Sequence, residues 1–450
     1  MKKIFVFLIV ICLVFTFFAA VQAEEDYYYN RIDRVFDWGT STTKVVINLQ
    51  TELSEDVIDY NSFNVEVKRL DIRKDSTLIE SGQRKVLNAY VSNASGKKTN
   101  TGKFVTLELE VGPAISIDSA ISYDLEQNKN DWIKVDYRIE QIKDIETKDE
   151  TVSGLVITKL KDIIRPQLEA FNYSSFTYND QLNGEIRLTY ADYKPEINDG
   201  VKKPLVIWLH GGGEGGTDPT IPLAGNKSVN LASKEIQQIY ESAYVLVPQT
   251  PTRWMDAAAN EREFEHLPTN SGENGLPYTS KYTATLINLI KSYVKKNPEI
   301  DTNRIYLGGC SNGGFMTLRL GIDYPDYFAA LYPVCHGMDY NYLTDGDINK
   351  LVDQNIWFVS AATDTILPAP DFTLPLYDRL IKEGAENVYL SYPETVVDTS
   401  GLYRDEKGKA YEYPGHWSWI YVYNNDLSNI IDGKTVYIHQ WLARQNKLYK

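Results

Sequence analysis

The sequence has 450 residues, with 46 Lys and Arg residues against 61 Asp and Glu residues and a formal net charge of −15. A chain this acidic repels nucleic acid and anionic membrane surfaces, so we expect neither as a partner. Three cysteines are too few for a scaffold built on disulfides, and stability must come from apolar cores, which the 43% hydrophobic content can supply. The length is typical of two domains.

Residues 1–23 have the pattern of a secretory signal peptide. Lys2 and Lys3 precede an apolar run over residues 4–18, in which Thr16 is the one polar residue, and small residues follow it up to Ala23. The apolar run is shorter than the roughly 20 residues that a membrane-spanning helix needs. Cleavage after Ala23 leaves a mature chain that begins at Glu24. The pattern predicts secretion, to the extracellular space or the periplasm.

Residues 24–150 are predicted to form a β-sandwich of the immunoglobulin-like type. Apolar and polar side chains alternate along segments such as 63–68, 105–111 and 133–139. This period of two places one face of a strand on a core and the other in water. About seven such strands, with no convincing helix between them, fit two packed antiparallel sheets. The segment contains no histidine and no catalytic motif, so we expect it to pack, position or bind.

Beyond a connecting segment over residues 151–172, the pattern changes. A hairpin is predicted over residues 173–190, with a turn at Asn183-Gly184, because this pair tolerates the positive φ angles of a tight turn. Short apolar runs then alternate with segments of helical spacing; the runs are 205–209, 244–247, 305–307, 329–334, 356–361 and 388–392. This alternation predicts an α/β fold with a doubly wound, mostly parallel sheet. Ligands bind such sheets beyond the carboxyl ends of the strands.

The sequence G-C-S-N-G, residues 309–313, matches the pattern G-x-S-x-G between a predicted strand and a predicted helix. A serine on such a sharp turn is held in a strained conformation that exposes its hydroxyl group, and side chains two residues before or after it would collide. The helix that follows directs its positive N-terminal end at the site. A glycine-rich turn without function is the alternative, but the flanking strand and helix favour Ser311 as a nucleophile.

A glycine-rich loop, H-G-G-G-E-G-G, directly follows the strand at 205–209. Glycines let backbone N–H groups approach a developing oxyanion, so we expect Gly212 or Gly213, together with the N–H of Asn312, to form an oxyanion hole. A phosphate-binding loop is the alternative, but no lysine follows at the required spacing. His210 is interpreted as a structural residue that holds the loop.

Five histidines are available as the general base, and His416 in a late loop is the best candidate. In this fold the chain order is serine, acid, histidine, and a base at this position fits it. His416 would remove the serine proton and later give it to the leaving alcohol. The remaining histidines lie in the glycine loop, in an acidic and aromatic insertion, after a strand, and on a C-terminal helix: His210, His266, His336 and His439.

The acid of the triad should follow a strand between the serine and the histidine. Asp364 lies just beyond the strand at 356–361 and is the preferred candidate. Asp371 and Asp398 are its rivals, but Asp371 lies deeper in the next segment and Asp398 lies in a polar loop.

Aromatic residues flank the predicted base. Trp419, one helical turn from His416, is expected to supply a further oxyanion donor, with plain packing as the alternative. Trp417, Trp254 and His336 are expected to contact the substrate, although a histidine placed like His336 is more often structural. These side chains would shape the pocket around the reacting ester.

Two long insertions, residues 217–230 and 254–282, are expected to form the rim of this pocket. Aromatic residues in the second insertion, such as Phe264 and Tyr278, suit an apolar or aromatic acyl group. Cys310 and Cys335 end neighbouring strands, and we expect small buried side chains there rather than a disulfide.

Residues 210–216, 310–316, 324–330 and 415–417 resemble secreted esterases related to polyhydroxybutyrate depolymerases and feruloyl esterases. The resemblance covers the chain from about residue 173 to its end. With the leading sandwich, the architecture is similar to bacterial esterases that carry an N-terminal immunoglobulin-like domain. The resemblance implies an alpha/beta-hydrolase fold over residues 173–450 and the cleavage of short acyl esters. One departure is the sequence S-A-A-T-D at residues 360–364, where the family often has a His-Gly pair before the acid.

These observations predict a secreted serine carboxylesterase that works through an acyl-enzyme without a metal or organic cofactor. The expected substrates are short-chain acyl esters, or hydroxycinnamoyl or acetyl esters linked to a polysaccharide. A peptidase similar to prolyl oligopeptidase is one alternative, since it shares the fold and the chain order. A non-catalytic surface binding protein is another. The N-terminal domain is left with three roles: polysaccharide binding, packing over the site, or self-association into a homo-oligomer.

Overall fold

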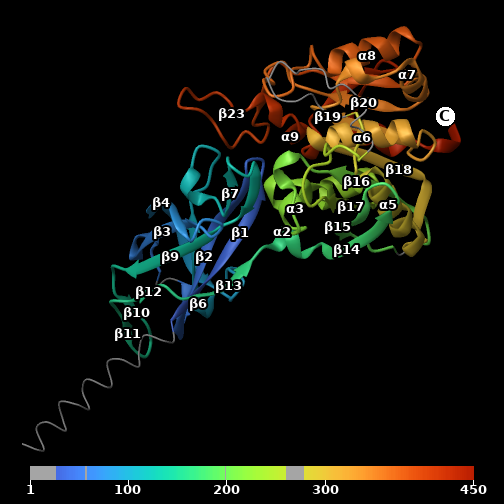
Figure 1. The fold of residues 1–450 in the computed structure, drawn as a ribbon. Helices are drawn as coiled ribbons and strands as arrows, with labels where there is room; N and C mark the ends of the chain where they lie inside the picture. The colour runs from blue at the N-terminus through green and yellow to red at the C-terminus, as the bar shows by residue number, and fades with distance from the viewer. Residues whose placement is uncertain (1–26, 56–57, 198, 260–277, 450) are drawn as a thin grey trace, which may run out of the picture. The chain divides into compact units, whose positions relative to one another are not determined.

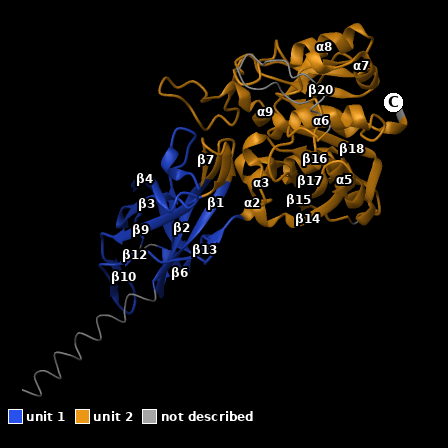
Figure 2. Cartoon of the chain, in the orientation of Figure 1, with its two compact units in different colours: residues 1–34, 41–120, 133–165 blue, residues 35–40, 121–132, 166–450 orange. Residues whose placement is uncertain are grey.

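The computed structural model describes residues 27–55, 58–197, 199–259 and 278–449. The predicted signal peptide lies outside these residues, and so do Phe264 and His266. In the part of the chain that is described, no helix is long and apolar enough to cross a membrane. The chain forms two compact units: residues 1–34, 41–120 and 133–165 belong to unit 1, and residues 35–40, 121–132 and 166–450 to unit 2 (Figure 2).

Unit 1 is a sandwich of two sheets. The first has the strand order β13-β1-β2-β6-β5 and the second β12-β9-β3-β4. The strands and 3-10 helices of this part of the chain are β1 (Tyr28–Phe36), β2 (Gly39–Ser54), η2 (Tyr60–Ser62), β3 (Phe63–Asp71), β4 (Thr77–Arg84), β5 (Val86–Ser92), β6 (Thr101–Leu109), η3 (Ser116–Asp118), β9 (Lys134–Gln141), β10 (Ile145–Glu146), β11 (Thr151–Val152), β12 (Val156–Ile157) and β13 (Leu160–Ile164). Alternate residues of β3, such as Val65 and Val67, are buried, and they share one core with Val45 and Val105. The alternation in the sequence therefore does build two packed sheets.

The boundaries of unit 1 differ from the predicted 24–150. Strand β13 lies in the predicted connecting segment, yet it pairs in parallel with β1, with Ile32 opposite Ile164. Conversely, the hairpin formed by β7 (Ile121–Asp124) and β8 (Lys129–Trp132) belongs to unit 2. Backbone pairing explains the first difference. Side chains of β8 that hydrogen bond to residues of unit 2 explain the second.

Unit 2 is built on an eight-stranded sheet with the order β14-β15-β17-β16-β18-β19-β20-β21 (Figure 1). The strands are β14 (Asn172–Asp180), β15 (Gly184–Tyr193), β16 (Lys203–Leu209), β17 (Tyr244–Gln249), β18 (Ile300–Cys310), β19 (Ala330–Val334), β20 (Ile356–Val359) and β21 (Val388–Ser391). The pairs β14–β15 and β15–β17 are antiparallel, and the remaining pairs are parallel. This is the doubly wound, mostly parallel sheet that the sequence predicts.

Helices cover both faces of this sheet. They are α2 (Pro166–Glu169), α3 (Ile221–Gly225), α4 (Lys234–Ile239), α5 (Thr283–Lys296), α6 (Asn312–Asp323), α7 (Asp345–Val352), α8 (Thr373–Lys382), α9 (Trp419–Tyr423) and α10 (Ile438–Arg444), with 3-10 helices η4 (Gly212–Glu214), η5 (Ser228–Ala232), η7 (Tyr340–Tyr342), η8 (Gly415–Trp417) and η9 (Lys447–Tyr449). Alternate residues of β16 enter two different cores: Val206 packs with α4, α9 and α10, and Ile207 packs with α5, α6, α7 and α8. Both faces of the central strands are thus buried, as their apolar sequences require.

Two further short sheets complete unit 2, formed by β22 (Val396–Val397) with β23 (Glu412–Tyr413) and by β24 (Ser428–Ile431) with β25 (Lys434–Tyr437). The predicted hairpin is β14–β15, but its turn differs from the tight Asn-Gly turn. Asp180 pairs with Gly184, so three residues form the loop. The Asp180 carboxylate accepts hydrogen bonds from the N–H groups of Leu182 and Asn183, and Gly184 has a φ of +77°. The side chain of Asp180 therefore organises the turn.

Candidate active site

Ser311 lies on a sharp turn between β18 and α6, with φ +55° and ψ −111°. The turn is pressed against the end of β16. A Cβ atom at Gly309 would lie 2.6 Å from the carbonyl oxygen of Leu209, and one at Gly313 would collide with the same oxygen. The Ser311 N–H donates to the carbonyl oxygen of Val334 at 2.8 Å, which fixes the turn against β19. The two glycines of the motif are required because β16 approaches so closely.

His416 and Asp364 form a hydrogen-bonded pair. Nδ1 of His416 lies 2.9 Å from Oδ2 of Asp364, and the Asp364 side chain is fully buried. Oδ1 of Asp364 accepts hydrogen bonds from the N–H groups of Ile366 and Leu367, which orient the carboxylate. A Cβ atom at Gly415 would collide with the carbonyl group of Thr363, so glycine lets the loop with His416 reach the acid.

Cys335 connects this pair to the serine turn. Its Sγ, a carboxylate oxygen of Asp364 and a ring nitrogen of His416 lie within 4.8 Å of one another. Cys335 directly follows Val334, whose carbonyl oxygen accepts the hydrogen bond from Ser311. Among the residues that the structure describes, the Ser311 hydroxyl makes no hydrogen bond to His416. Such contacts often close only when substrate is bound.

The glycine loop is organised by His210 and approaches the start of α6. Nδ1 of His210 lies 2.6 Å from the carbonyl oxygen of Gly211, and its Nε2 accepts the N–H of Thr250 at 3.2 Å. Burial lowers the pKa of His210 to about 4, so the ring stays neutral and holds the loop as expected. A Cβ atom at Gly212 would lie 4.0 Å from the side chain of Asn312, the first residue of α6. Backbone N–H groups in the first turn of a helix lack partners within the helix, so one can bind an oxyanion there.

The residue next to these glycines, Glu214, was not predicted from the sequence. It is buried, and its Oε1 accepts a hydrogen bond from Nδ2 of Asn130 at 2.8 Å. Burial raises the pKa of Glu214, which the hydrogen bonds from Asn130 and Asn226 oppose. Gly213 faces the hairpin β7–β8, because a Cβ atom there would lie 3.0 Å from the ring of Tyr123. A carboxylate within a glycine loop is the one sequence signal that could have indicated these contacts.

The structure places the predicted aromatic residues differently. Trp254 and His336 are fully buried, and the ring centroids of Trp254 and His210 lie 5.2 Å apart; the substrate contacts of Trp254 and His336 stay predictions. Burial also lowers the pKa of His336 to about 3. Trp417 is partly exposed, and Trp419 meets the His416 ring at 5.5 Å with an angle of 86° between the planes. Their substrate and oxyanion roles stay predictions.

The predicted insertions only partly form a rim. Half of residues 217–230 are buried, among them Ile221 and Leu223, which are fully buried. Tyr278 donates a hydrogen bond to Asp347 and lies under the guanidinium group of Arg319. Cys310 and Cys335 are buried free thiols, as the sequence suggests.

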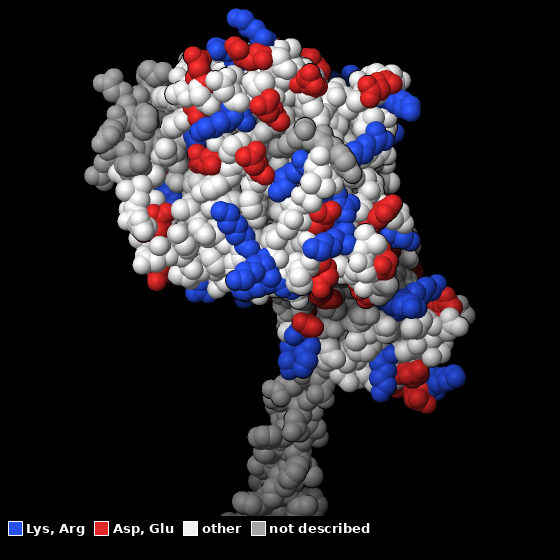
Figure 3. Space-filling model, turned by 90° about the vertical axis from the view of Figure 1, so that its right-hand side faces the viewer, with Lys and Arg blue, Asp and Glu red and all other residues white. Residues whose placement is uncertain are grey.

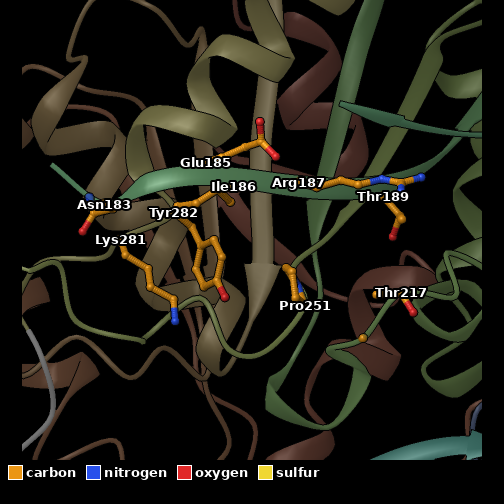
Figure 4. A pocket seen from close by; sticks show the side chains of 10 residues that line it. Asn183, Glu185, Ile186, Arg187, Thr189, Thr217, Pro251, Lys281 and Tyr282 are labelled. Carbon is orange, nitrogen blue, oxygen red and sulfur yellow. The ribbon is translucent and has the colours of Figure 1, made fainter. Parts of the chain in front are cut away.

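A cavity of about 530 Å³ opens beside the glycine loop (Figure 4). Polar, charged and apolar residues line it, from β15 and the turn before it, the end of the glycine loop, and the segments after β17 and before α5; they are Asn183, Glu185, Ile186, Arg187, Thr189, Gly216, Thr217, Pro251, Lys281 and Tyr282. Thr217 and Lys281 belong to the two predicted insertions, so each insertion contributes to this wall. The triad candidates are not among the lining residues.

The sequence and the structure resemble known proteins. Residues 28–154 match the model of the esterase Ig-like N-terminal domain. A solved structure described as a thermostable esterase covers 93% of this chain and 99% of its own, with 26% identity and a TM-score of 0.70. Two further solved structures are more distant. An acylaminoacyl peptidase of Pyrococcus horikoshii covers 58% of this chain and 44% of its own, with 16% identity and a TM-score of 0.35. A ferulic acid esterase covers 50% of this chain and 90% of its own, with 13% identity and a TM-score of 0.35, and neither likeness bears on function. No curated protein matches the chain.

The fold, the site and the similar esterase agree. Unit 1 is an immunoglobulin-like domain of the kind found in esterases, and unit 2 has the α/β-hydrolase fold. The chain is an enzyme, a serine hydrolase.

Proposed function

We propose that the chain is a secreted carboxylesterase that hydrolyses carboxylic esters through an acyl-enzyme on Ser311. The arrangement that carries the proposal is a serine on a strained strand-to-helix turn, with a histidine nearby whose Nδ1 is held by a buried carboxylate. A base oriented in this way presents Nε2 to the nucleophile.

The reaction follows from these positions. Nε2 of His416 takes the proton of Ser311 while Oγ attacks the ester carbonyl carbon, and Asp364 stabilises the imidazolium ion that forms. The N–H groups of Asn312 and Gly212 stabilise the negative charge on the former carbonyl oxygen. His416 then protonates the departing alcohol, and a water molecule, activated by the same ring, hydrolyses the acyl-enzyme. No step requires a metal or organic cofactor.

An ester is favoured over a peptide as the substrate. The thermostable esterase is similar over nearly the full length of both chains, including the N-terminal domain. The residues that line the cavity beside the glycine loop include charged and hydroxyl-bearing side chains, such as Glu185, Arg187 and Thr217, which suit a hydroxyl-rich alcohol such as a sugar. We therefore extend the proposal to short acyl or hydroxycinnamoyl esters of polysaccharides.

The proposal includes secretion and a neutral substrate. The charged n-region, the apolar run and the small residues before Glu24 support removal of a signal peptide. Lys and Arg side chains are interspersed with Asp and Glu side chains on the face shown in Figure 3, and the net charge is −15. Both features support a neutral ester over nucleic acid or an anionic membrane surface.

The test is hydrolysis of nitrophenyl esters from acetyl to lauroyl by the mature protein and its Ser311→Ala variant, with peptide nitroanilides in parallel. We expect ester turnover in the wild type and none above background in the variant. Turnover of the anilides alone would replace the esterase with a peptidase. A folded wild-type protein that cleaves neither would leave the binding-protein alternative.

A further inference from the structure

The hairpin β7–β8 lies within the sequence of the N-terminal domain, but its contacts make it part of unit 2 (Figure 2). Its register pairs Ile121 with Trp132 and Tyr123 with Asn130. Residues directly opposite one another, and residues two apart on one strand, share a face. These four side chains therefore form a single face of the hairpin.

This face is directed at the glycine loop of the candidate active site. Nδ2 of Asn130 donates to Oε1 of Glu214 at 2.8 Å, and Nε1 of Trp132 donates to Oγ1 of Thr220 at 2.8 Å. The Tyr123 ring lies against Gly213, where a Cβ atom would be 3.0 Å from it. The three contacts involve three different positions of the segment that begins at the oxyanion loop, so three of the four side chains of this face are engaged.

Two features indicate more than packing. Glu214 is 4% exposed, and a carboxylate so deeply buried is tolerated only where donors such as Asn130 satisfy it. Tyr123, by contrast, is 47% exposed, although its ring abuts the loop. An aromatic ring left half in solvent beside a catalytic loop is available to a ligand. A Cβ atom at Gly212 would lie 3.9 Å from Nε of Arg253, so Arg253 lies beside the same loop.

We propose that this hairpin face is part of the active site: Asn130 is a positioning residue that holds the oxyanion loop through Glu214, and Tyr123 is a specificity-determining residue that bounds the substrate space beside Gly213. The inference rests on the proposed ester hydrolysis and deepens it, because it assigns residues of the N-terminal sequence to the choice of substrate. The loop carries the donors that meet the oxyanion, so a displaced loop slows the chemical step more than it weakens binding.

The test compares Asn130→Ala, Tyr123→Ala and Tyr123→Phe with a matched control in the same hairpin. Leu125 lies in the turn and is 83% exposed, so Leu125→Ala keeps the hairpin and leaves its inner face intact. We expect Asn130→Ala to lower kcat about tenfold to a hundredfold with KM within about threefold of the wild type. We expect Tyr123→Ala to change the ratio of kcat/KM for octanoyl and acetyl nitrophenyl esters by about tenfold, and Tyr123→Phe to leave it within about twofold.

A second measurement separates this inference from the proposed function. Labelling of Ser311 by a fluorophosphonate depends on the base and the oxyanion loop but needs no ester substrate. The labelling rate is therefore measured for the same variants, and thermal unfolding checks that each variant is folded. A wild-type protein that is labelled but cleaves no ester would refute the proposed esterase activity. The role of the hairpin would then be tested by the labelling rates of the variants. Asn130→Ala and Tyr123→Ala variants that match Leu125→Ala in labelling and selectivity would overturn the inference alone. Because Tyr123 is half exposed, we expect its variants to fold. They therefore still test the inference if Asn130→Ala does not fold.

Discussion

Gly313 is the residue at which the geometry of the nucleophile turn is most restrictive. A methyl group there would meet the carbonyl oxygen of Leu209 at the end of β16, and backbone atoms have no rotamers with which to avoid it. We expect Gly313→Ala to displace Ser311, to lower kcat/KM at least about a hundredfold, and to lower the free energy of unfolding by about 1–3 kcal/mol. Steady-state kinetics and urea denaturation measure the two effects.

Gly346 provides the control for this substitution. It lies in the first turn of α7, and a Cβ atom there would meet only Oγ1 of Thr344 at 3.6 Å, an ordinary contact. Gly346→Ala should leave kcat/KM within about twofold and stabilise the helix slightly, because alanine has the higher helix propensity. Equal losses in the two variants would show that the close approach of β16 does not constrain the turn.

Asp364 is distinguished from its rivals by its partner. It alone among the three aspartates considered is hydrogen bonded to His416, whereas Asp398 accepts bonds from Ser400 and the N–H of Gly401. We expect Asp364→Asn to lower kcat by about 10³–10⁴ with little change in KM, since the amide no longer holds the histidine tautomer that the serine needs. Asp398→Asn should affect stability and leave kcat within about threefold. Pre-steady-state acylation rates decide the matter, and a large kcat loss in Asp398→Asn alone would reverse the assignment.

Sequence reasoning reached the triad candidates because a motif and a chain order constrain them, whereas it could not predict which side chains are buried. G-x-S-x-G and the order serine, acid, histidine depend on local backbone geometry and on topology, which a sequence carries. Trp254 and His336 were expected at the substrate, yet both are fully buried. Their exposure depends on neighbours distant in the sequence, such as His210 against Trp254. Asn130 and Glu214 are separated by 84 positions, and no periodicity connects them.

At the scale of elements, the turn between β14 and β15 depends on one glycine. Gly184 has a φ of +77°, and a Cβ atom there would meet nothing within 4 Å. The cost of Gly184→Ala is therefore backbone strain alone, about 1 kcal/mol of unfolding free energy, while Gly184→Asn should lose less because asparagine tolerates this conformation. Urea denaturation measures both, with kcat/KM expected to stay within about twofold. A larger loss for asparagine than for alanine would contradict the strain argument.

The sequence predicts which elements form more reliably than which unit they join. Buried strands such as β16 and β18 and the alternating β3 follow from their apolar patterns. The hairpin β7–β8 lies within residues 24–150, for which the sequence predicts a sandwich, but it belongs to unit 2. A period of two shows that a face is buried and does not show against what. Here the partner is the glycine loop, which only the three-dimensional structure reveals.

At the scale of the whole molecule, titratable groups are divided unequally between the two units. His210, His336 and His439 are all buried in unit 2, and burial lowers their pKa values to about 4, 3 and 4. Unit 1 contains no histidine, but burial raises the pKa of Asp118 to about 6. The buried histidines of unit 2 and Asp118 of unit 1 should therefore act oppositely on stability as the pH falls.

Each buried histidine binds a proton more readily when unfolded, near its ordinary pKa of about 6.5, than when folded. Its contribution to stability is complete above about pH 6.5 and is lost as the pH falls toward about 4, so the free energy of unfolding of unit 2 should fall by about 2 kcal/mol per histidine between pH 7 and pH 5. For Asp118 the sign is reversed: its folded pKa is raised, so unit 1 gains about 1 kcal/mol over the same interval.

Fluorescence can measure this difference, because all eight tryptophans of the chain lie in unit 2. Urea unfolding followed by tryptophan emission at pH 7 and pH 5 therefore reports on the unit that carries the histidines. The matched variant is His439→Gln, since the ring of His439 hydrogen bonds to Tyr240 and to the carbonyl oxygen of Val422 and to none of the triad candidates. Whatever the variant does to stability at pH 7, the loss between pH 7 and pH 5 should shrink by about 2 kcal/mol, because the proton that His439 binds on unfolding is no longer taken up. An undiminished loss would show that His439 is already protonated in the folded protein, and the acid sensitivity of unit 2 would then have to come from other groups.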